Sequence, residues 1–341
     1  MNMNKATGFL SVVLMAQLLL AGTLMFSVPD LAAVRPDTPL IELTDQSVDR
    51  LIIEGADNEK VVLRKASDRW TLPDHFGFPV ENGKVAQLIE QLKSLQHGFP
   101  IATTSTALTR FKVTDKSFER RITLAQGNEV LKKIYLGSSP GIRRIHARTD
   151  ENEAVYSVNF SAYQVPTKAE NWEDKEILRF PQEDIEEIRV ADLIIRQAPA
   201  EPAKEKKEKA EGAEKEEKST PPKQPVWIAE GLGAGERLDE EGAAKLAGLL
   251  SGLRIARVMG IEPQAEYGLN APRLSLSYRR KNAEIVEYVL GKAESGTDFV
   301  LKASQREEYF RLDDYTVKPL LEAASRDKLA KNGEKDDTPV E

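Results

Sequence analysis

The sequence predicts an α+β protein: an N-terminal transmembrane helix followed by two tandem homologous units, each a mainly antiparallel sheet packed with one main helix. Three observations lead to this prediction. The N-terminus carries an uncharged apolar run, each half of the chain contains one amphipathic helical segment, and short alternating segments typical of half-buried strands follow both helices. The 341 residues, 40% of them hydrophobic, suffice for two domains with cores of their own.

The composition excludes several classes of function. Because the chain has no cysteine, it can form no disulfide framework, thiolate nucleophile, iron–sulfur cluster or cysteine-ligated zinc site. Only three histidines are present, which argues against a histidine-rich metal site. With 48 Lys+Arg against 55 Asp+Glu, the chain lacks the basic field that gathers nucleic acid. We therefore expect no metal, no other cofactor and no nucleic-acid partner.

Residues 6–28 form the uncharged apolar run, with Gln17 as its only strongly polar side chain. About 20 apolar residues suffice for a helix to cross a ~30 Å hydrocarbon core, whereas the apolar part of a signal peptide usually has about 7–15. The length favours an uncleaved anchor. A cleaved signal peptide is the alternative, since residues 31–33 are a small-residue stretch that loosely resembles a cleavage site.

The charges beside this run predict its orientation. Lys5 precedes it, and Asp30 follows it at once, with Arg35 only further on. The positive-inside rule then places the N-terminus in the cytoplasm and the bulk of the chain outside. This predicts a cytoplasmic segment at 1–5, an anchor at 6–28 and a spacer at 29–44.

Two copies of one unit are predicted to fill the rest of the chain. Each begins with a hairpin and a tryptophan-containing segment, followed by a helix with one apolar face. The helical faces that align are Val85, Leu88, Ile89, Leu92 and Leu95 after Trp70, and Ala243, Leu246, Ala247, Leu250 and Leu253 after Trp227.

Paired strand segments come next. Residues 121–124 align with 273–276, and the segments that end at Gly137 and Gly291 also align. Each copy then closes with a short helical segment bearing one tyrosine, Tyr163 or Tyr315. The alignment predicts a first unit at 45–180, a second at 181–328 and a disordered tail at 329–341.

A charged insertion separates Arg196 from Trp227, whereas only five residues separate Arg64 from Trp70. Residues 198–224 are mostly Glu, Lys, Ala and Pro, a composition that cannot repay the entropy of ordering. Its mid-chain position suggests an interdomain linker. The repeat alignment instead places it inside the second unit, as a disordered loop between neighbouring strands.

A family resemblance rests on the Trp-x-Leu segments, on Tyr267, Gly268 and Leu269 before Pro272, and on the Leu-Gly strand ends. Together these resemble the DUF4340 family of uncharacterised bacterial proteins. In the first unit Tyr-Gly-Leu is replaced by Phe-Lys-Val at 111–113, which weakens the assignment of that copy. The resemblance implies a single-pass protein of the bacterial inner membrane with its bulk in the periplasm. Members are often encoded beside ABC-type transport systems resembling the gliding-motility auxiliary kind, which implies a transporter-associated role.

The sequence offers no convincing catalytic constellation. Residues 137–141 match the G-x-S-x-G pattern of serine hydrolases, with His146 nearby, but the following residues read as a strand, so we expect a hairpin turn. Trp70 and Trp227 are better interpreted as core residues than as sugar platforms. The signature residues are therefore expected to be structural: Trp70, Trp227, Tyr267, Gly268, Leu269, Gly137 and Gly291.

The sequence thus favours a non-catalytic, membrane-anchored envelope scaffold or accessory subunit with protein partners in an envelope complex. The alternative is a periplasmic enzyme or ligand-binding protein that acts on envelope glycan or lipid through a cleft between the repeats.

Overall fold

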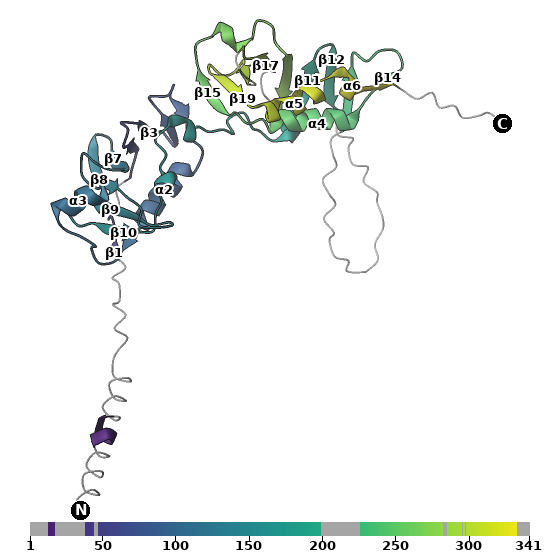
Figure 1. Cartoon of the computed structure of the whole chain (residues 1–341). Helices are drawn as coiled ribbons and strands as arrows, with labels where there is room; N and C mark the ends of the chain where they lie inside the picture. The colour runs from purple at the N-terminus through teal and green to yellow at the C-terminus, as the bar shows by residue number, and fades with distance from the viewer. Residues whose placement is uncertain are drawn as a thin grey trace, which may run out of the picture. The chain divides into compact units, whose positions relative to one another are not determined.

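The computed structural model describes residues 13–17, 38–43, 47–198, 226–281, 285–294, 296 and 298–332 (Figure 1). Most of the predicted anchor and nearly all of the predicted insertion lie outside these residues, although residues 13–17 are helical. Among the described helices, none is long and apolar enough to cross a membrane.

Internal contacts divide the chain into two compact units. The N-terminal unit comprises the described residues within Met1–Val48, Ile53–Asn58 and Leu88–Val165. The C-terminal unit comprises those within Asp49–Ile52, Glu59–Gln87 and Pro166–Glu341. The α+β class predicted from the sequence is confirmed, because each of two eight-stranded sheets is accompanied by helices.

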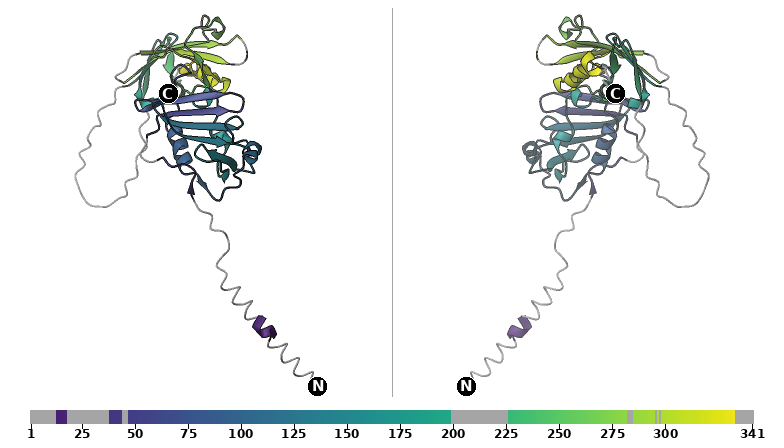
Figure 2. Two further views of the ribbon diagram at one scale, coloured as in Figure 1. Left: turned by 90° about the vertical axis from the view of Figure 1, so that its left-hand side faces the viewer. Right: turned by 90° about the vertical axis from the view of Figure 1, so that its right-hand side faces the viewer.

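The first sheet has the strand order β10-β9-β8-β7-β2-β3-β4-β5, and Figure 2 shows its strands side by side. The strands are β2 (Arg50–Gly55), β3 (Lys60–Ala66), β4 (Arg69–Leu72), β5 (Phe78–Pro79), β7 (Arg120–Gln126), β8 (Glu129–Leu136), β9 (Ile145–Thr149) and β10 (Tyr156–Val158). The helix predicted after Trp70 is α2 (Lys84–Lys93), and it buries the side chains at positions 85, 88, 89 and 92.

A helix that was not predicted from the sequence packs on part of the N-terminal unit. It is α3 (Ser105–Phe111), whose first turn is capped by the Thr104 hydroxyl. Its Leu108 packs in a small cluster with Val113, Tyr135 and Val155. Every residue of β9 is buried, and His146 of that strand packs against the Phe111 ring at the end of α3.

The second sheet has the order β13-β12-β11-β16-β17-β18-β19-β15. Its strands are β11 (Ile185–Val190), β12 (Leu193–Gln197), β13 (Trp227–Glu230), β15 (Arg257–Gly260), β16 (Leu274–Arg280), β17 (Ile285–Lys292), β18 (Phe299–Ala303) and β19 (Tyr309–Leu312). The helices that accompany it, grouped together in Figure 1, are α4 (Glu240–Ser251), α5 (Asp314–Ala323) and α6 (Arg326–Leu329). Leucines 246, 250 and 320 are among the residues of this core.

Two short sheets include residues that the sequence places in the 29–44 spacer and in the 329–341 tail. In one, β1 (Thr38–Pro39) pairs with β6 (Gln96–His97), and the adjacent Leu40 and Ile41 are buried, so packed structure begins inside the predicted 29–44 spacer. In the other, β14 (Glu236–Leu238) pairs with β20 (Ala330–Asn332).

The predicted disordered tail at 329–341 is therefore wrong for its first four residues. Leu329 is fully buried, and residues 330–332 are held by backbone pairing and by an ion pair between Lys331 Nζ and Asp239 Oδ2 at 2.7 Å. Backbone pairing leaves no trace in hydrophobic periodicity, which explains the error. Residues 333–341 lie outside the described residues.

Candidate functional site

The Tyr-Gly-Leu signature forms a tight turn in the C-terminal unit. Tyr267 is buried, and Gly268 adopts the left-handed conformation with φ 66°. A Cβ on Gly291 would lie 2.3 Å from the Tyr267 carbonyl oxygen, and one on Gly268 would lie 2.1 Å from that of Lys292. Both glycines are required by this close backbone approach. Leu269 is half-buried beside them.

The N-terminal unit repeats this arrangement with different residues. Lys112, which follows Phe111 at the end of α3, also has a positive φ of 55°. A Cβ on Gly137 would lie 1.9 Å from the Phe111 carbonyl oxygen. The turn therefore persists where the sequence motif is degraded, with a lysine in the place of Gly268.

The two signature tryptophans differ in burial. Trp227 is 2% exposed and belongs to the C-terminal core. Trp70 is only half-buried and lines a surface hollow with Arg69, Glu81 and Asp174. The core interpretation thus describes Trp227, while Trp70 keeps part of its ring accessible.

The G-x-S-x-G segment forms a turn between β8 and β9. Its central serine, Ser139, donates to a backbone oxygen, that of Gly141 at 2.7 Å or that of Arg144 at 2.6 Å, and so closes the turn. His146 contacts the neighbouring serine instead, with 3.0 Å between its Nδ1 and Ser138 Oγ.

The Ser138–His146 pair is the arrangement in the N-terminal unit that most resembles a nucleophile with its base. Burial lowers the pKa of His146, which is 7% exposed and packs against the Phe111 ring, so the imidazole is neutral at pH 7. Ser138 lines a surface hollow of about 430 Å³ with three arginines, at positions 120, 143 and 144. In the described part of the chain, no carboxylate bonds to His146 to orient it.

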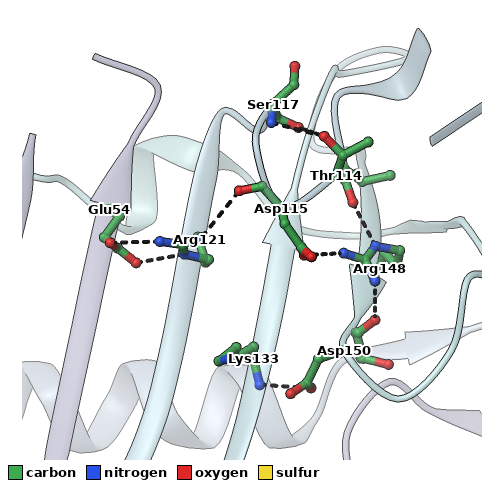
Figure 3. Close-up of polar contacts among 10 residues, drawn as sticks. Glu54, Thr114, Asp115, Ser117, Arg121, Lys133, Arg148 and Asp150 are labelled. Atoms are coloured by element: carbon green, nitrogen blue, oxygen red, sulfur yellow. Dashed lines mark hydrogen bonds and ion pairs between the residues drawn. The ribbon is translucent and has the colours of Figure 1, made fainter. Parts of the chain in front are cut away.

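A second polar cluster lies beneath the residues that follow α3 (Figure 3). Arg148, 8% exposed, donates to the Val113 carbonyl oxygen at 2.6 Å and to Asp115 at 3.0 Å, and its guanidinium lies 4.2 Å from the Tyr135 ring centre. The Tyr135 hydroxyl lowers the pKa of Asp115 by hydrogen bonding, against the effect of burial, and Arg148 adds to the lowering.

The same cluster contains a bidentate ion pair, in which Arg121 donates to both carboxylate oxygens of Glu54, at 2.7 and 2.8 Å. Arg121 and Asp115 line a hollow of about 410 Å³. These charged groups already bond to one another and to the backbone of residues 113–115. Their bonds therefore hold the segment that follows α3 in place.

Two buried glutamates in the C-terminal unit could not be located from the sequence. Glu173 is buried, accepts from the Val258 amide at 3.2 Å and contacts His75 Nε2 at 2.8 Å. His75 lies 98 residues away from Glu173 in the chain. Burial raises the pKa of Glu173, and the contact with His75 only partly opposes it.

The other buried carboxylate, Glu187, has three arginine partners, at positions 189, 196 and 279, with N–O distances of 2.6, 2.6 and 2.9 Å. Burial alone would raise the pKa of Glu187, but hydrogen bonds from Arg196 and Arg189 outweigh it and the pKa is lowered. Within the described residues, no group of three His, Cys, Asp or Glu side chains could hold a metal ion.

The fold defines an α+β protein with two large sheets, whose signature glycines shape close backbone turns. The chain belongs to the DUF4340 family, described as a domain of unknown function, whose model matches residues 70–272. No curated protein and no solved structure matches the chain.

Proposed function

We propose that the chain is a non-catalytic accessory subunit of a bacterial envelope complex, anchored in the inner membrane by residues 6–28 with both units in the periplasm. The uncharged run, the order of the charges beside it and its length support the anchor. The partner is an envelope protein. A component of an ABC-type transport system resembling the gliding-motility auxiliary kind fits what the family resemblance implies.

The observation that carries the accessory role is the β13 edge of the second sheet, which has a single strand partner among the described residues. β13 is the terminal strand, and its described pairing is with β12 alone. Trp227 enters the core, while Val226 and Ile228 on either side of it are 55% and 50% exposed. A terminal strand that presents apolar side chains and free backbone groups is a template for strand addition by another protein.

A lysine at position 228 tests this role, because charge on an edge strand opposes strand pairing. Tagged full-length protein should recover its partner from detergent-solubilised membranes, and Ile228→Lys should lose that partner. Ile285→Lys is the matched control, since Ile285 is 42% exposed on β17, which is paired on both sides. Equal recovery by the two variants would contradict the proposal.

We further propose that residues 45–180 and 181–328 arose by tandem duplication. Seven strands of each sheet support this, because the orders β10-β9-β8-β7-β2-β3-β4 and β19-β18-β17-β16-β11-β12-β13 correspond one to one. The matching turns at Lys112 and Gly268, each over a strand-end glycine, give a second and local line of support.

The contact between Ser138 and His146 favours one other candidate, a periplasmic hydrolase. In that reaction Ser138 Oγ would attack the substrate carbonyl carbon while His146 takes its proton, and His146 would return this proton to the leaving group as its bond to the carbonyl carbon breaks. A fluorophosphonate probe tests this, because the serine oxygen bonds to phosphorus as fluoride leaves. Labelling that Ser138→Ala abolishes and Ser139→Ala retains would establish the hydrolase, and an unlabelled wild-type chain would exclude it.

A further inference from the structure

Ile142 and Tyr163 are the two most exposed large hydrophobic side chains of the described residues, at 93% and 95%. Ile142 lies in the turn between β8 and β9, and Tyr163 lies in the short 3-10 helix Ala162–Gln164 that follows β10. Tyr163 and the residue after Ile142, Arg143, line the same 430 Å³ hollow. The two side chains therefore flank one patch of the N-terminal unit.

The patch is basic. Arg120, Arg143 and Arg144 line its hollow, and the acidic residue there, Glu119, is paired with Lys112 at 2.6 Å. Arg144 donates to Ser157 and Arg120 to the Val165 carbonyl oxygen, so both are held in place. Arg143 has no ion-pair partner in the described part of the chain, which leaves its guanidinium available to an anion.

The described chain enters the N-terminal unit at the same end. Thr38 in β1 pairs with His97 in β6, and β6 contacts β10. His97 and Arg144 line one further hollow of about 460 Å³, which joins the entry point to the basic patch.

Chain length limits how far this end can lie from the proposed anchor. Nine residues, 29–37, separate the apolar run from Thr38. Ten Cα-to-Cα steps of no more than about 3.6 Å join Val28 to Thr38, so the two residues lie at most about 36 Å apart. An anchor at 6–28 therefore confines this end of the N-terminal unit to the neighbourhood of the bilayer surface.

We propose that Ile142, Arg143 and Tyr163 form a membrane-surface contact that docks the N-terminal unit on the anionic bilayer holding its anchor. Tyrosine and isoleucine side chains enter the boundary between headgroups and acyl chains, and arginine pairs with lipid phosphate. This inference rests on the anchor of the proposed function, and it adds a lipid site to that function.

The absence of cysteine permits a direct test by spin labelling of the full-length chain. Ile142→Cys, Tyr163→Cys and the control Tyr315→Cys are each labelled and reconstituted in phosphatidylglycerol–phosphatidylethanolamine vesicles. Tyr315 is 78% exposed but belongs to the C-terminal unit. Labels at 142 and 163 should collide less with an aqueous nickel chelate and more with oxygen than the label at 315. Equal nickel accessibility at all three positions would overturn the contact.

A charge reversal tests the role of Arg143. In the Tyr163→Cys background, Arg143→Glu should lower the ratio of docked to free units about fivefold or more, the effect of a single basic residue at an anionic surface. Arg254→Glu, at another exposed arginine, should leave the ratio unchanged. Wild-type Arg143 on neutral phosphatidylcholine vesicles should show the same fall in the ratio of docked to free units. A ratio of docked to free units that changes neither with Arg143→Glu nor with lipid charge would overturn the proposal.

The same samples separate this proposal from the anchor. A chain that leaves the vesicles in an alkaline wash lacks the anchor, whereas a retained chain with accessible labels has the anchor but not the contact. Protection of the labels only after membrane proteins are added would identify a protein partner at this patch and overturn the lipid assignment.

Discussion

Gly268 and Lys112 occupy corresponding turns, but their surroundings differ at the atomic level. Gly268 is enclosed, because a Cβ there would meet the Lys292 carbonyl oxygen and carbon at 2.1 and 3.0 Å. Lys112 carries a side chain at nearly the same positive φ, and that side chain extends to Glu119. The N-terminal turn has thus kept the backbone shape of the motif while losing its glycine.

This difference predicts opposite effects of substitution at the two turns. Gly268→Ala should lower the free energy of unfolding by about 2–4 kcal/mol, since it adds both a clash with backbone and left-handed strain. Lys112→Gly should raise the midpoint of thermal unfolding by about 2–4 °C, because glycine adopts this conformation without a Cβ penalty. Thermal and urea unfolding of both variants check this. Stabilisation by Gly268→Ala would contradict the assigned geometry.

Glu173 and Glu187 are both 1% exposed, yet their surroundings shift their pKa values in opposite directions. Burial raises the pKa of Glu173, so the folded state binds this proton more tightly than the unfolded state. Its contribution to stability is therefore lost as the pH rises above about 4.3, the ordinary glutamate pKa. The lowered pKa of Glu187 gives a contribution that is present above that pH and is lost as the pH falls through the folded-state value.

The glutamine variants should therefore show pH dependences of opposite sign. Relative to wild type, Glu173→Gln should gain stability from pH 4.5 to pH 8, while Glu187→Gln should be several degrees less stable at pH 7 and approach wild type in acid. Unfolding midpoints from about pH 2 to pH 8 measure both differences, because the Glu187 contribution is lost only below the ordinary glutamate pKa. A parallel response of the two variants would show that their environments are not distinct.

At the scale of elements, hydrophobic periodicity located the parts that bury a regular face. The helices α2 and α4 bury the predicted faces, and the strands β16 and β17 largely alternate as predicted, whereas β7 and β8 bury runs of consecutive residues. It missed α3, which has seven residues with only Ala107 and Leu108 buried, and β20, which is held by backbone pairing. The signal for α3 was local, namely a Thr104 cap.

Arg148 in β9 bonds to the segment after α3 through both the Val113 carbonyl oxygen and the Asp115 carboxylate, which predicts a contrast within one ion pair. Arg148→Met should cost about 2 kcal/mol of unfolding free energy, because it leaves the Val113 carbonyl oxygen without its donor. Asp115→Asn should cost far less, since the Asp115 side chain is 74% exposed.

Hydrogen exchange of residues 112–119 checks this prediction, because local opening of the segment should speed exchange in Arg148→Met alone. Equal exchange in wild type and Arg148→Met would show that other contacts hold the segment.

At the scale of the whole molecule, the sequence predicted the α+β class and the family, but it could not predict the polar sites. Contacts such as His75 with Glu173 join residues far apart in the chain and have no periodic signature. Local sequence did indicate the turn at 137–141, yet it gave no sign that Ser138 rather than Ser139 would contact His146. Exposure of Ile142 and Tyr163 depends on the packing around them, so a surface patch of this kind also required the structure.

The central claim is that residues 6–28 hold the folded units at the inner membrane, and the mature protein tests it most directly. Membranes from cells that produce the full chain are washed with high salt and then at alkaline pH, and the mass of the retained chain is measured. We expect the protein to stay in the membrane fraction with its N-terminus intact, because neither wash opposes the burial of this uncharged, largely apolar 23-residue run in a bilayer. A mature chain that begins near Val34 and leaves with the soluble fraction would contradict the anchor.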